Sequence, residues 1–186
     1  MVKRIALTAR YPFAGCTRIA KTLASEYGYR HISMSDILIQ EFTLNLQELS
    51  YGTINKSPDE IKMNKELYRK QLHDFAIEYE DQFIDLILEE INSYPGENIV
   101  VEKVRSDKQA DALRGEGFQL YRIERPEHAV MSVAKRHGHS QETWNSMLRS
   151  GSEGRISDDK ISDTLTNYYT SDILVKYLAS YTRGYL

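Results

Sequence analysis

The chain has 186 residues, 41% of them hydrophobic and 27% charged, which suits one compact domain with a sizeable core. A net charge of −3 excludes a global basic field of the kind that holds a nucleic-acid backbone, so nucleic acid is not an expected partner. One cysteine excludes a disulfide framework, no apolar run approaches the length of a membrane span, and we therefore expect a cytoplasmic protein without a membrane partner.

The first third of the chain predicts two strands, each followed by a helix. Residues 3–9 show a short strand pattern, and residues 17–27 show the apolar spacing of an amphipathic helix that Gly28 ends. A second strand is expected over residues 29–33, with a helix beginning near Ser35. A strand, a loop and a helix therefore occupy the start of the sequence.

The remainder alternates in the same way. The stretch Ser57-Pro58-Asp59-Glu60 predicts a helix N-terminus, because serine caps, proline suits the first position and acids favour the first turn. Apolar residues then recur at helical spacing as far as Ile91. Strand patterns follow over 98–104 and 118–123, and helical patterns over 106–114, 126–137, 141–150 and 170–182. Strands alternating with helices indicate an α/β domain with a parallel sheet and right-handed crossovers.

The first loop has the layout of a phosphate-binding loop. In the pattern G-x-x-x-x-G-K-[ST], Gly15 fills the second glycine and Thr17 supplies the hydroxyl that would hold Mg²⁺. Arg10 replaces the first glycine and Cys16 replaces the lysine, and Arg10 or Arg18 could supply some of the missing charge. The position between a strand and a helix favours anion binding by backbone N–H groups. An ordinary turn with a small cysteine packed at the bend is the alternative.

Two later segments carry candidate phosphate-binding cations. Glu102 and Arg105 end the strongest strand pattern, at the sheet edge where ligands of α/β proteins bind, and an arginine there suits a bidentate grip on phosphate. A plain surface ion pair is the alternative. Lys135 and Arg136 end a later helix, and Arg149 lies beyond it. Such cations could close over a transferred phosphate, or simply complement the helix dipole.

Taken in order, these segments resemble the P-loop nucleoside and deoxynucleoside monophosphate kinase family, including its dephospho-coenzyme A kinase-like branch. The resemblance starts with IALTARYPFAGCTRIAKTLASEYGYRHISMSDIL and continues through LYRKQLHDFAIEY and IVVEKVRSDKQADALRGEGFQLYRIERP. It closes with SEGRISDDKISDTLTNYYTSDILVKYL. It covers nearly the whole chain and rests on the order and spacing of the segments rather than on one motif.

The resemblance implies a three-layer P-loop NTPase fold of class α/β in a single domain over 1–186, with five parallel strands flanked by helices. It also implies a helical acceptor-binding arm over 36–95, a small lid region over 126–157, and ATP and Mg²⁺ as cofactors. The expected donor-phosphate residues are Ala14, Gly15, Cys16 and Thr17, with Thr17 also holding the metal; the expected acceptor residues are Asp36, Arg69, Glu102 and Arg105; and the expected catalytic cations are Arg10, Arg18, Arg136 and Arg149.

Three functions stay open at this point. The favoured one is an enzyme with an altered loop, which moves the γ-phosphoryl of ATP to a (deoxy)nucleoside monophosphate or a related small acceptor. The second is a catalytically inactive kinase-like protein that binds a nucleotide or a regulatory partner, as the cysteine in place of the loop lysine suggests. The third is a kinase acting on a modified base in DNA. Such a kinase needs a basic groove, which the net negative charge of the chain does not supply. The acceptor, the sugar preference and the oligomeric state are not readable from the sequence.

Overall fold

The computed structural model describes residues 2–49, 56–136, 138–140, 142, 156–167 and 171–181. The chain forms two compact units, the first made of Met1–Ile32 with Tyr94–Leu186 and the second of Ser33–Ser93. No helix in the described part of the chain is both long enough and apolar enough to cross a bilayer.

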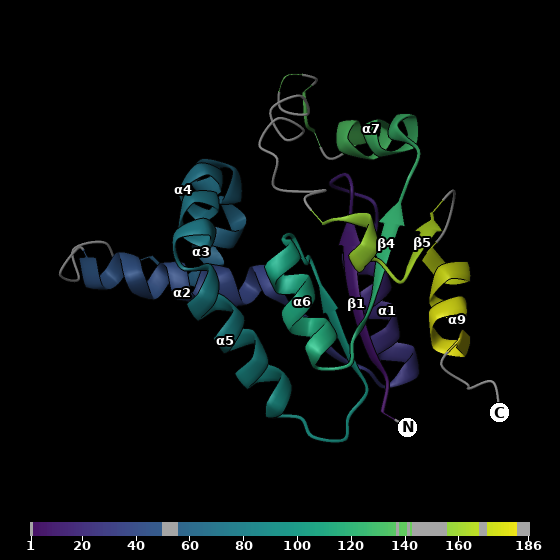
Figure 1. Cartoon of the computed structure of the whole chain (residues 1–186). Coiled ribbons are helices and arrows are strands. Elements are labelled where there is room, and N and C mark those ends of the chain that lie inside the picture. The colour runs from purple at the N-terminus through teal and green to yellow at the C-terminus, as the bar shows by residue number, and fades with distance from the viewer. Residues whose placement is uncertain are drawn as a thin grey trace. The chain divides into compact units, whose positions relative to one another are not determined.

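The strands form one five-stranded sheet in the order β2-β3-β1-β4-β5 (Figure 1). Strand β1 pairs in parallel with β3 and with β4, and β4 pairs in parallel with β5. The prediction of an α/β fold on a five-stranded parallel sheet is confirmed. Because β1 is central, the loop that follows it opens at the middle of the carboxyl edge of the sheet. The strands are β1 (Arg4–Ala9), β2 (Arg30–Ser33), β3 (Ile99–Glu102), β4 (Gln119–Glu124) and β5 (Asp163–Thr166).

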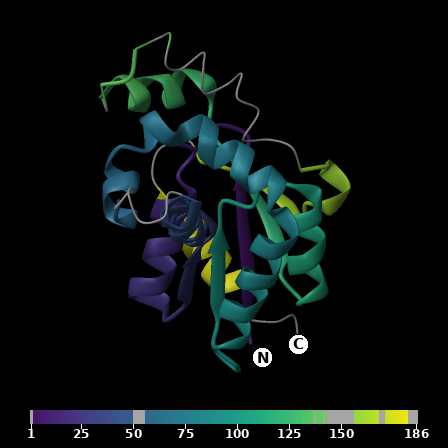
Figure 2. The same ribbon diagram turned by 90° about the vertical axis from the view of Figure 1, so that its left-hand side faces the viewer.

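Helices cover both faces of this sheet. Helix α1 packs with α9 on one face, and α6 covers the other (Figures 1 and 2). Helix α7 follows β4 and lies beyond the carboxyl ends of β1 and β4 in both views. The helices of this unit are α1 (Cys16–Tyr27), α6 (Asp107–Gly115), α7 (Glu127–Arg136) and α9 (Ser171–Tyr181), with a 3₁₀ turn η1 (Asp158–Lys160) before β5.

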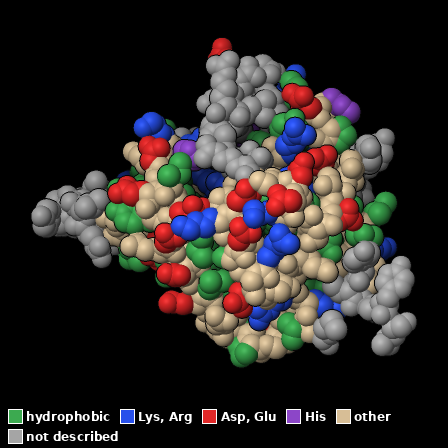
Figure 3. Space-filling view, in the orientation of Figure 1, with side chains coloured by type: hydrophobic (Ala, Val, Ile, Leu, Met, Phe, Trp, Pro, Cys, Tyr) green, Lys and Arg blue, Asp and Glu red, His purple; other side chains and the backbone are tan. Residues whose placement is uncertain are grey.

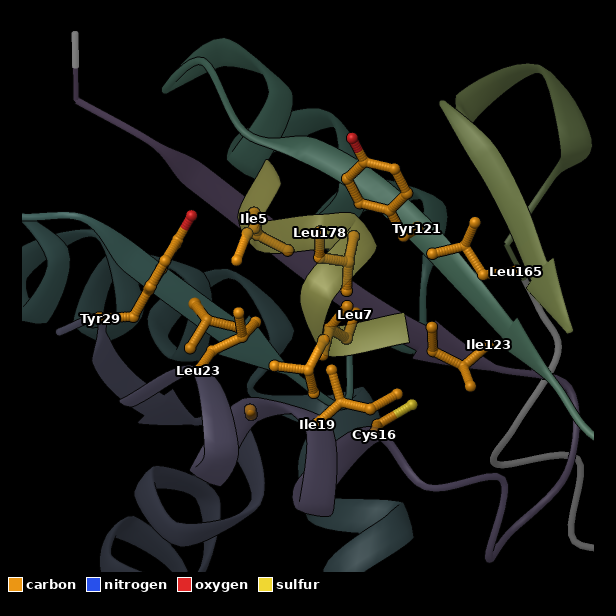
Figure 4. Packing of buried hydrophobic residues seen from close by; sticks show 14 of the residues in the cluster. Ile5, Leu7, Cys16, Ile19, Leu23, Tyr29, Tyr121, Ile123, Leu165 and Leu178 are labelled. Atoms are coloured by element: carbon orange, nitrogen blue, oxygen red, sulfur yellow. The ribbon is translucent and has the colours of Figure 1, made fainter. Parts of the chain in front are cut away.

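The core that holds β1 and α1 in place is mainly aliphatic. Ile5 and Leu7 of β1 pack with Ile19 and Leu23 of α1 and with Leu178 of α9 (Figure 4). Each of these side chains is at most 1% exposed, and burying such a side chain stabilises the fold by about 1.5–3 kcal/mol. Both ends of the first loop are therefore fixed to a rigid core.

The second unit is helical. The predicted N-terminus at Ser57 is present as a capping box, in which Ser57 Oγ accepts from the Glu60 N–H and the Glu60 carboxylate accepts from the Ser57 N–H. The long apolar pattern that follows is divided into three helices, with breaks at Asn64 and Tyr79. The helices of this unit are α2 (Met34–Leu49), α3 (Pro58–Met63), α4 (Lys65–Glu78) and α5 (Glu80–Asn92).

Candidate functional site

A cavity of about 970 Å³ opens around the loop between β1 and α1, and we call it the loop cavity. Residues 11–18 form one side of it, and further residues of α1, the residues that follow β3 and β4, and residues of α7 form the rest. A concave wall with positive charge from several elements suits a ligand that carries several negative charges. The basic residues in the wall are Arg18, Lys21, Lys103, Arg105, Arg125 and Arg136.

The N-terminus of α1 points its first backbone N–H groups at this cavity. Gly15 is the N-cap residue and, having no side chain, offers them no capping hydrogen bond. The first N–H groups of a helix have no partner within the helix, and the helix dipole makes this end attractive to anions. Tyr11 and Phe13, which also line the cavity, pack against Val130 and Ala134 of α7. The loop cavity therefore combines an open helix N-terminus with a basic wall.

Asn167, directly after β5, fixes the loop between β1 and α1 by a hydrogen bond. Its side chain is buried, and its Nδ2 donates to the Ala14 carbonyl oxygen at 2.8 Å. Its own N–H donates to the Glu124 carbonyl oxygen, which ties the contact to the sheet. A Cβ added to Gly15 would lie 2.7 Å from Asn167 Nδ2, and Gly15 has a φ of +113°. Glycine is required here both by the backbone angle and by the neighbour.

Glu102, at the end of β3, gathers three polar neighbours although it is only 1% exposed. Thr17 Oγ1 donates to Glu102 Oε2 at 2.6 Å, while His31 Nε2 lies 3.2 Å and Lys103 Nζ 3.8 Å from Oε1. Burial raises the pKa of Glu102, but the hydrogen bond with His31, the charge of Lys103 and the hydrogen bond from Thr17 outweigh it, so the pKa lies below its usual value. The carboxylate is therefore ionised at neutral pH.

The pair Thr17 and Glu102 fits a magnesium ion. Mg²⁺ prefers oxygen ligands and, in phosphoryl-transfer sites, takes one or two carboxylates together with substrate phosphates and water. An ionised carboxylate and a hydroxyl in contact, beside an anion-binding helix end, supply that protein part. Within the described ranges, no group of three or more His, Cys, Asp or Glu side chains gathers as a metal cage.

Cys16, which stands where a phosphate loop carries its lysine, directs its side chain into the core. It is 8% exposed, and its Sγ donates to the Thr8 carbonyl oxygen at 3.4 Å. Figure 4 shows Cys16 beside Ile19 within the apolar cluster. Any contact between Cys16 and a phosphate would therefore come from its backbone N–H.

Most of the predicted phosphate-handling residues of the first unit line the loop cavity. They are Ala14, Gly15, Cys16, Thr17, Arg18, Arg105 and Arg136. Arg18 is also 3.8 Å from Asp172 Oδ1 of α9, and its side chain is 68% exposed. Arg10 instead lines a separate polar cavity of about 440 Å³ together with Arg122 and Asp158. Arg149 lies outside the described residues.

The predicted acceptor residues Asp36 and Arg69 belong to the second unit. Asp36 forms an ion pair with Lys62 of α3, with Nζ and Oδ1 2.8 Å apart. The predicted arm (36–95) nearly coincides with this unit, Ser33–Ser93. Its role in holding an acceptor stays a prediction, as do the roles of these two side chains and of the lid region, of which α7 is the main described part.

Sequence reasoning missed two cations in the wall of the loop cavity. Lys103 follows β3 directly and has a φ of +68°, which is uncommon for a residue with a side chain. Arg125 follows β4 directly, and its Nε is buried without a hydrogen-bond partner among the described residues. Their position was the available signal, since side chains at the carboxyl ends of parallel strands surround ligands in α/β folds.

On the face drawn in Figure 3, acidic and basic side chains are intermixed. Arg122 pairs with Asp158, and Lys160 Nζ donates to Asp111 Oδ1 at 2.7 Å. These two basic side chains thus have acidic neighbours. The described residues that line the loop cavity, in contrast, include six basic side chains and no acidic one.

No family sequence model matches the chain, and no curated protein matches it in sequence. Solved structures do resemble it. A protein from Thermus thermophilus is 14% identical with a TM-score of 0.65, over 99% of this chain and 100% of its own. A gluconokinase from Sinorhizobium meliloti is 15% identical with a TM-score of 0.54, over 96% and 90%. A sugar kinase from a Janibacter species is 14% identical with a TM-score of 0.50, over 95% and 92%. At these identities the likeness establishes the fold alone, an α/β fold with a five-stranded parallel sheet flanked by helices.

Proposed function

We propose that the protein is a phosphotransferase that moves the γ-phosphoryl of ATP, with Mg²⁺, to a (deoxy)nucleoside monophosphate or a related small acceptor. The observation that carries this is the 2.6 Å contact between Thr17 Oγ1 and the ionised Glu102 carboxylate, at the N-terminus of α1. In P-loop phosphotransferases a loop hydroxyl and a strand-end carboxylate hold the metal. The kinases among similar structures support the reaction class, and the sequence resemblance supports the acceptor.

In this reaction the chain mainly positions and neutralises charge. The backbone N–H groups at Gly15 and the start of α1 bind the donor phosphates. Arg105 and Arg136, both in the wall of the loop cavity, neutralise charge on the transferred phosphoryl group. Thr17 and Glu102 would hold Mg²⁺, which would supply positive charge to the phosphates. Asp36 and Arg69 orient the acceptor.

The direction of Cys16 favours a second candidate, a kinase-like protein that binds nucleotide without transferring phosphate. With this side chain in the core, the usual loop ammonium is missing from its position. Loss of one charge-assisted contact in a water-poor site costs on the order of 3 kcal/mol, or about a hundredfold in rate. Binding without turnover would identify this candidate.

The test is a phosphoryl-transfer assay with ATP–Mg²⁺ and a panel of ribo- and deoxyribonucleoside monophosphates. We expect turnover in the wild type and a loss of about a hundredfold or more in Glu102→Gln, which keeps the size of the side chain but removes its charge. Glu97→Gln is the matched control, because that carboxylate is exposed and pairs with Arg30 away from the loop cavity.

Thermal melts separate binding from chemistry. At a hundredfold excess over its dissociation constant, ATP–Mg²⁺ stabilises a binding protein by about 2.7 kcal/mol. If no nucleotide shifts the melt and no acceptor is phosphorylated, the proposed function is wrong. If ATP–Mg²⁺ shifts the melt and nothing is phosphorylated, the second candidate replaces the first.

A further inference from the structure

A phosphate site without its loop lysine needs another sheltered cation near the transferred group. The Cys16 side chain cannot provide one, because it is uncharged and faces the core. The wall of the loop cavity contains several cations, and they differ in how close they lie to the Thr17–Glu102 pair, where the terminal phosphates and Mg²⁺ would meet.

Lys103 lies directly beside that pair. Its Nζ is 3.8 Å from Glu102 Oε1, and the other oxygen of the same carboxylate accepts the Thr17 hydroxyl. A single carboxylate thus separates the ammonium from the first turn of α1. The Lys103 side chain is 28% exposed, so it reaches the cavity while most of it stays out of bulk water. In such a setting its charge acts more strongly on a phosphate than an exposed charge does.

Three other cations in the wall are placed less well for this task. The Arg18 side chain is 68% exposed and has Asp172 as a neighbour on α9. Arg136 is exposed at the last residue of α7. Arg125 follows β4, which lies on the opposite side of β1 from β3 and Glu102. Charge on these three residues can surround a ligand, whereas Lys103 forms an ion pair with the carboxylate that accepts the Thr17 hydroxyl.

The backbone conformation at Lys103 supports a role in ligand binding. A φ of +68° at a residue other than glycine costs on the order of 1–3 kcal/mol, and such residues cluster at ligand sites where the surrounding structure holds them. The chain is held here because Val104, the next residue, is buried and donates its N–H to Leu7 of β1. The left-handed turn comes directly after the last residue of β3 and keeps the ammonium beside Glu102.

We infer that Lys103 takes the place of the missing loop lysine: its ammonium, presented by the end of β3, binds the terminal phosphates of the donor at the loop cavity. This inference rests on the proposed function, because it assigns a residue to the donor site of that reaction. The site would thus take its positive charge from the strand beside the loop instead of from the loop itself.

The test measures binding of inorganic tripolyphosphate with Mg²⁺ by calorimetry, in the full chain. Lys103→Met removes the charge and nearly preserves length, and we expect its affinity to fall at least about tenfold, the loss typical of one charge-assisted contact. Lys103→Arg keeps a cation and should stay within severalfold of the wild type. Lys176→Met on α9 is the control for the same charge change at an exposed site.

A folded-state control uses Lys103→Gly. Glycine accepts a φ of +68° without strain, so this variant should fold even if Lys103→Met is unstable, and it should show the same loss of affinity. If the wild type binds tripolyphosphate while both charge-removing variants bind it equally well, the role of Lys103 is refuted and the proposed function stands. If the wild type binds neither tripolyphosphate nor ATP–Mg²⁺, both proposals fall.

Discussion

At the scale of the residue, the first loop is set by contacts that its own motif does not contain. Gly15 and Thr17 match the phosphate-loop pattern, and both line the loop cavity. The partner that makes Gly15 indispensable is Asn167, which lies more than 150 positions later in the chain. The sequence also does not indicate which way the Cys16 side chain points, because a small thiol fits both a ligand site and an apolar core. Sequence spacing identifies such positions but not which way their side chains face.

The fit between Gly15 and Asn167 can be measured. We expect Gly15→Ala to destabilise the protein by about 1–3 kcal/mol, because the new Cβ adopts a disfavoured φ and meets Asn167 Nδ2. Asn167→Ala in the same chain should recover part of that loss by removing the steric contact. Urea unfolding of both single variants and the double variant gives the coupling energy.

Gly115→Ala is the control for this pair, because a Cβ there meets no atom within 4 Å and no positive φ is present. It should leave the free energy of unfolding nearly unchanged. Strictly additive effects of Gly15→Ala and Asn167→Ala would contradict the contact.

At the scale of the element, the strands that could be predicted are those with apolar runs. Strand β3 is buried throughout, and the sequence pattern over 98–104 predicts it clearly. Strand β5 (Asp163–Thr166) has no such pattern, since only Leu165 is buried, and only the family resemblance implied a fifth strand. An edge strand with one partner needs one inward side chain, so its sequence carries little periodic signal. The helix start at Ser57 was readable because capping chemistry is local.

That helix start gives a prediction at the same scale. Ser57→Ala removes one half of the capping box, and we expect a loss of about 1 kcal/mol in the free energy of unfolding. Ser25→Ala, an exposed serine inside α1, makes the same chemical change without a cap and should cost much less. Equal effects of the two changes, measured by thermal or urea unfolding, would show that the cap contributes nothing.

At the scale of the whole molecule, the lowered carboxylate pKa values predict how stability responds to acid. Hydrogen bonds from Ser157 lower the pKa of Asp107, the hydrogen bond from Arg122 lowers that of Asp158, and the Ser57 N–H lowers that of Glu60. Each of these groups binds a proton more weakly when folded than when unfolded. Their contribution is therefore complete above the unfolded pKa, near 4, and is lost as the pH falls through the lower folded values.

Urea unfolding at pH 7, 5, 4 and 3 measures this response. We expect nearly constant stability between pH 7 and 5 and a progressive loss below about pH 4.5. Glu102→Gln should flatten the decline, because the pKa of Glu102 is also lowered in the fold. Stability that stays level down to pH 3 would contradict the charge network described for these carboxylates.

The division into two units has a consequence during synthesis. The first unit is made of two stretches of chain, with the second unit encoded between them, and β1 pairs only with strands that come after that insertion. At a translation rate of 5–20 residues per second, roughly 5 to 20 seconds pass between the emergence of β1 and that of β3. During this interval β1 has no strand to pair with, and its apolar side chains Ile5 and Leu7 lack most of their core partners. The helices of Ser33–Ser93 can meanwhile form from local contacts. A nascent chain halted before β3 therefore exposes an unpaired, apolar central strand. We expect chaperone binding to nascent chains of increasing length to be strongest just before β3 emerges.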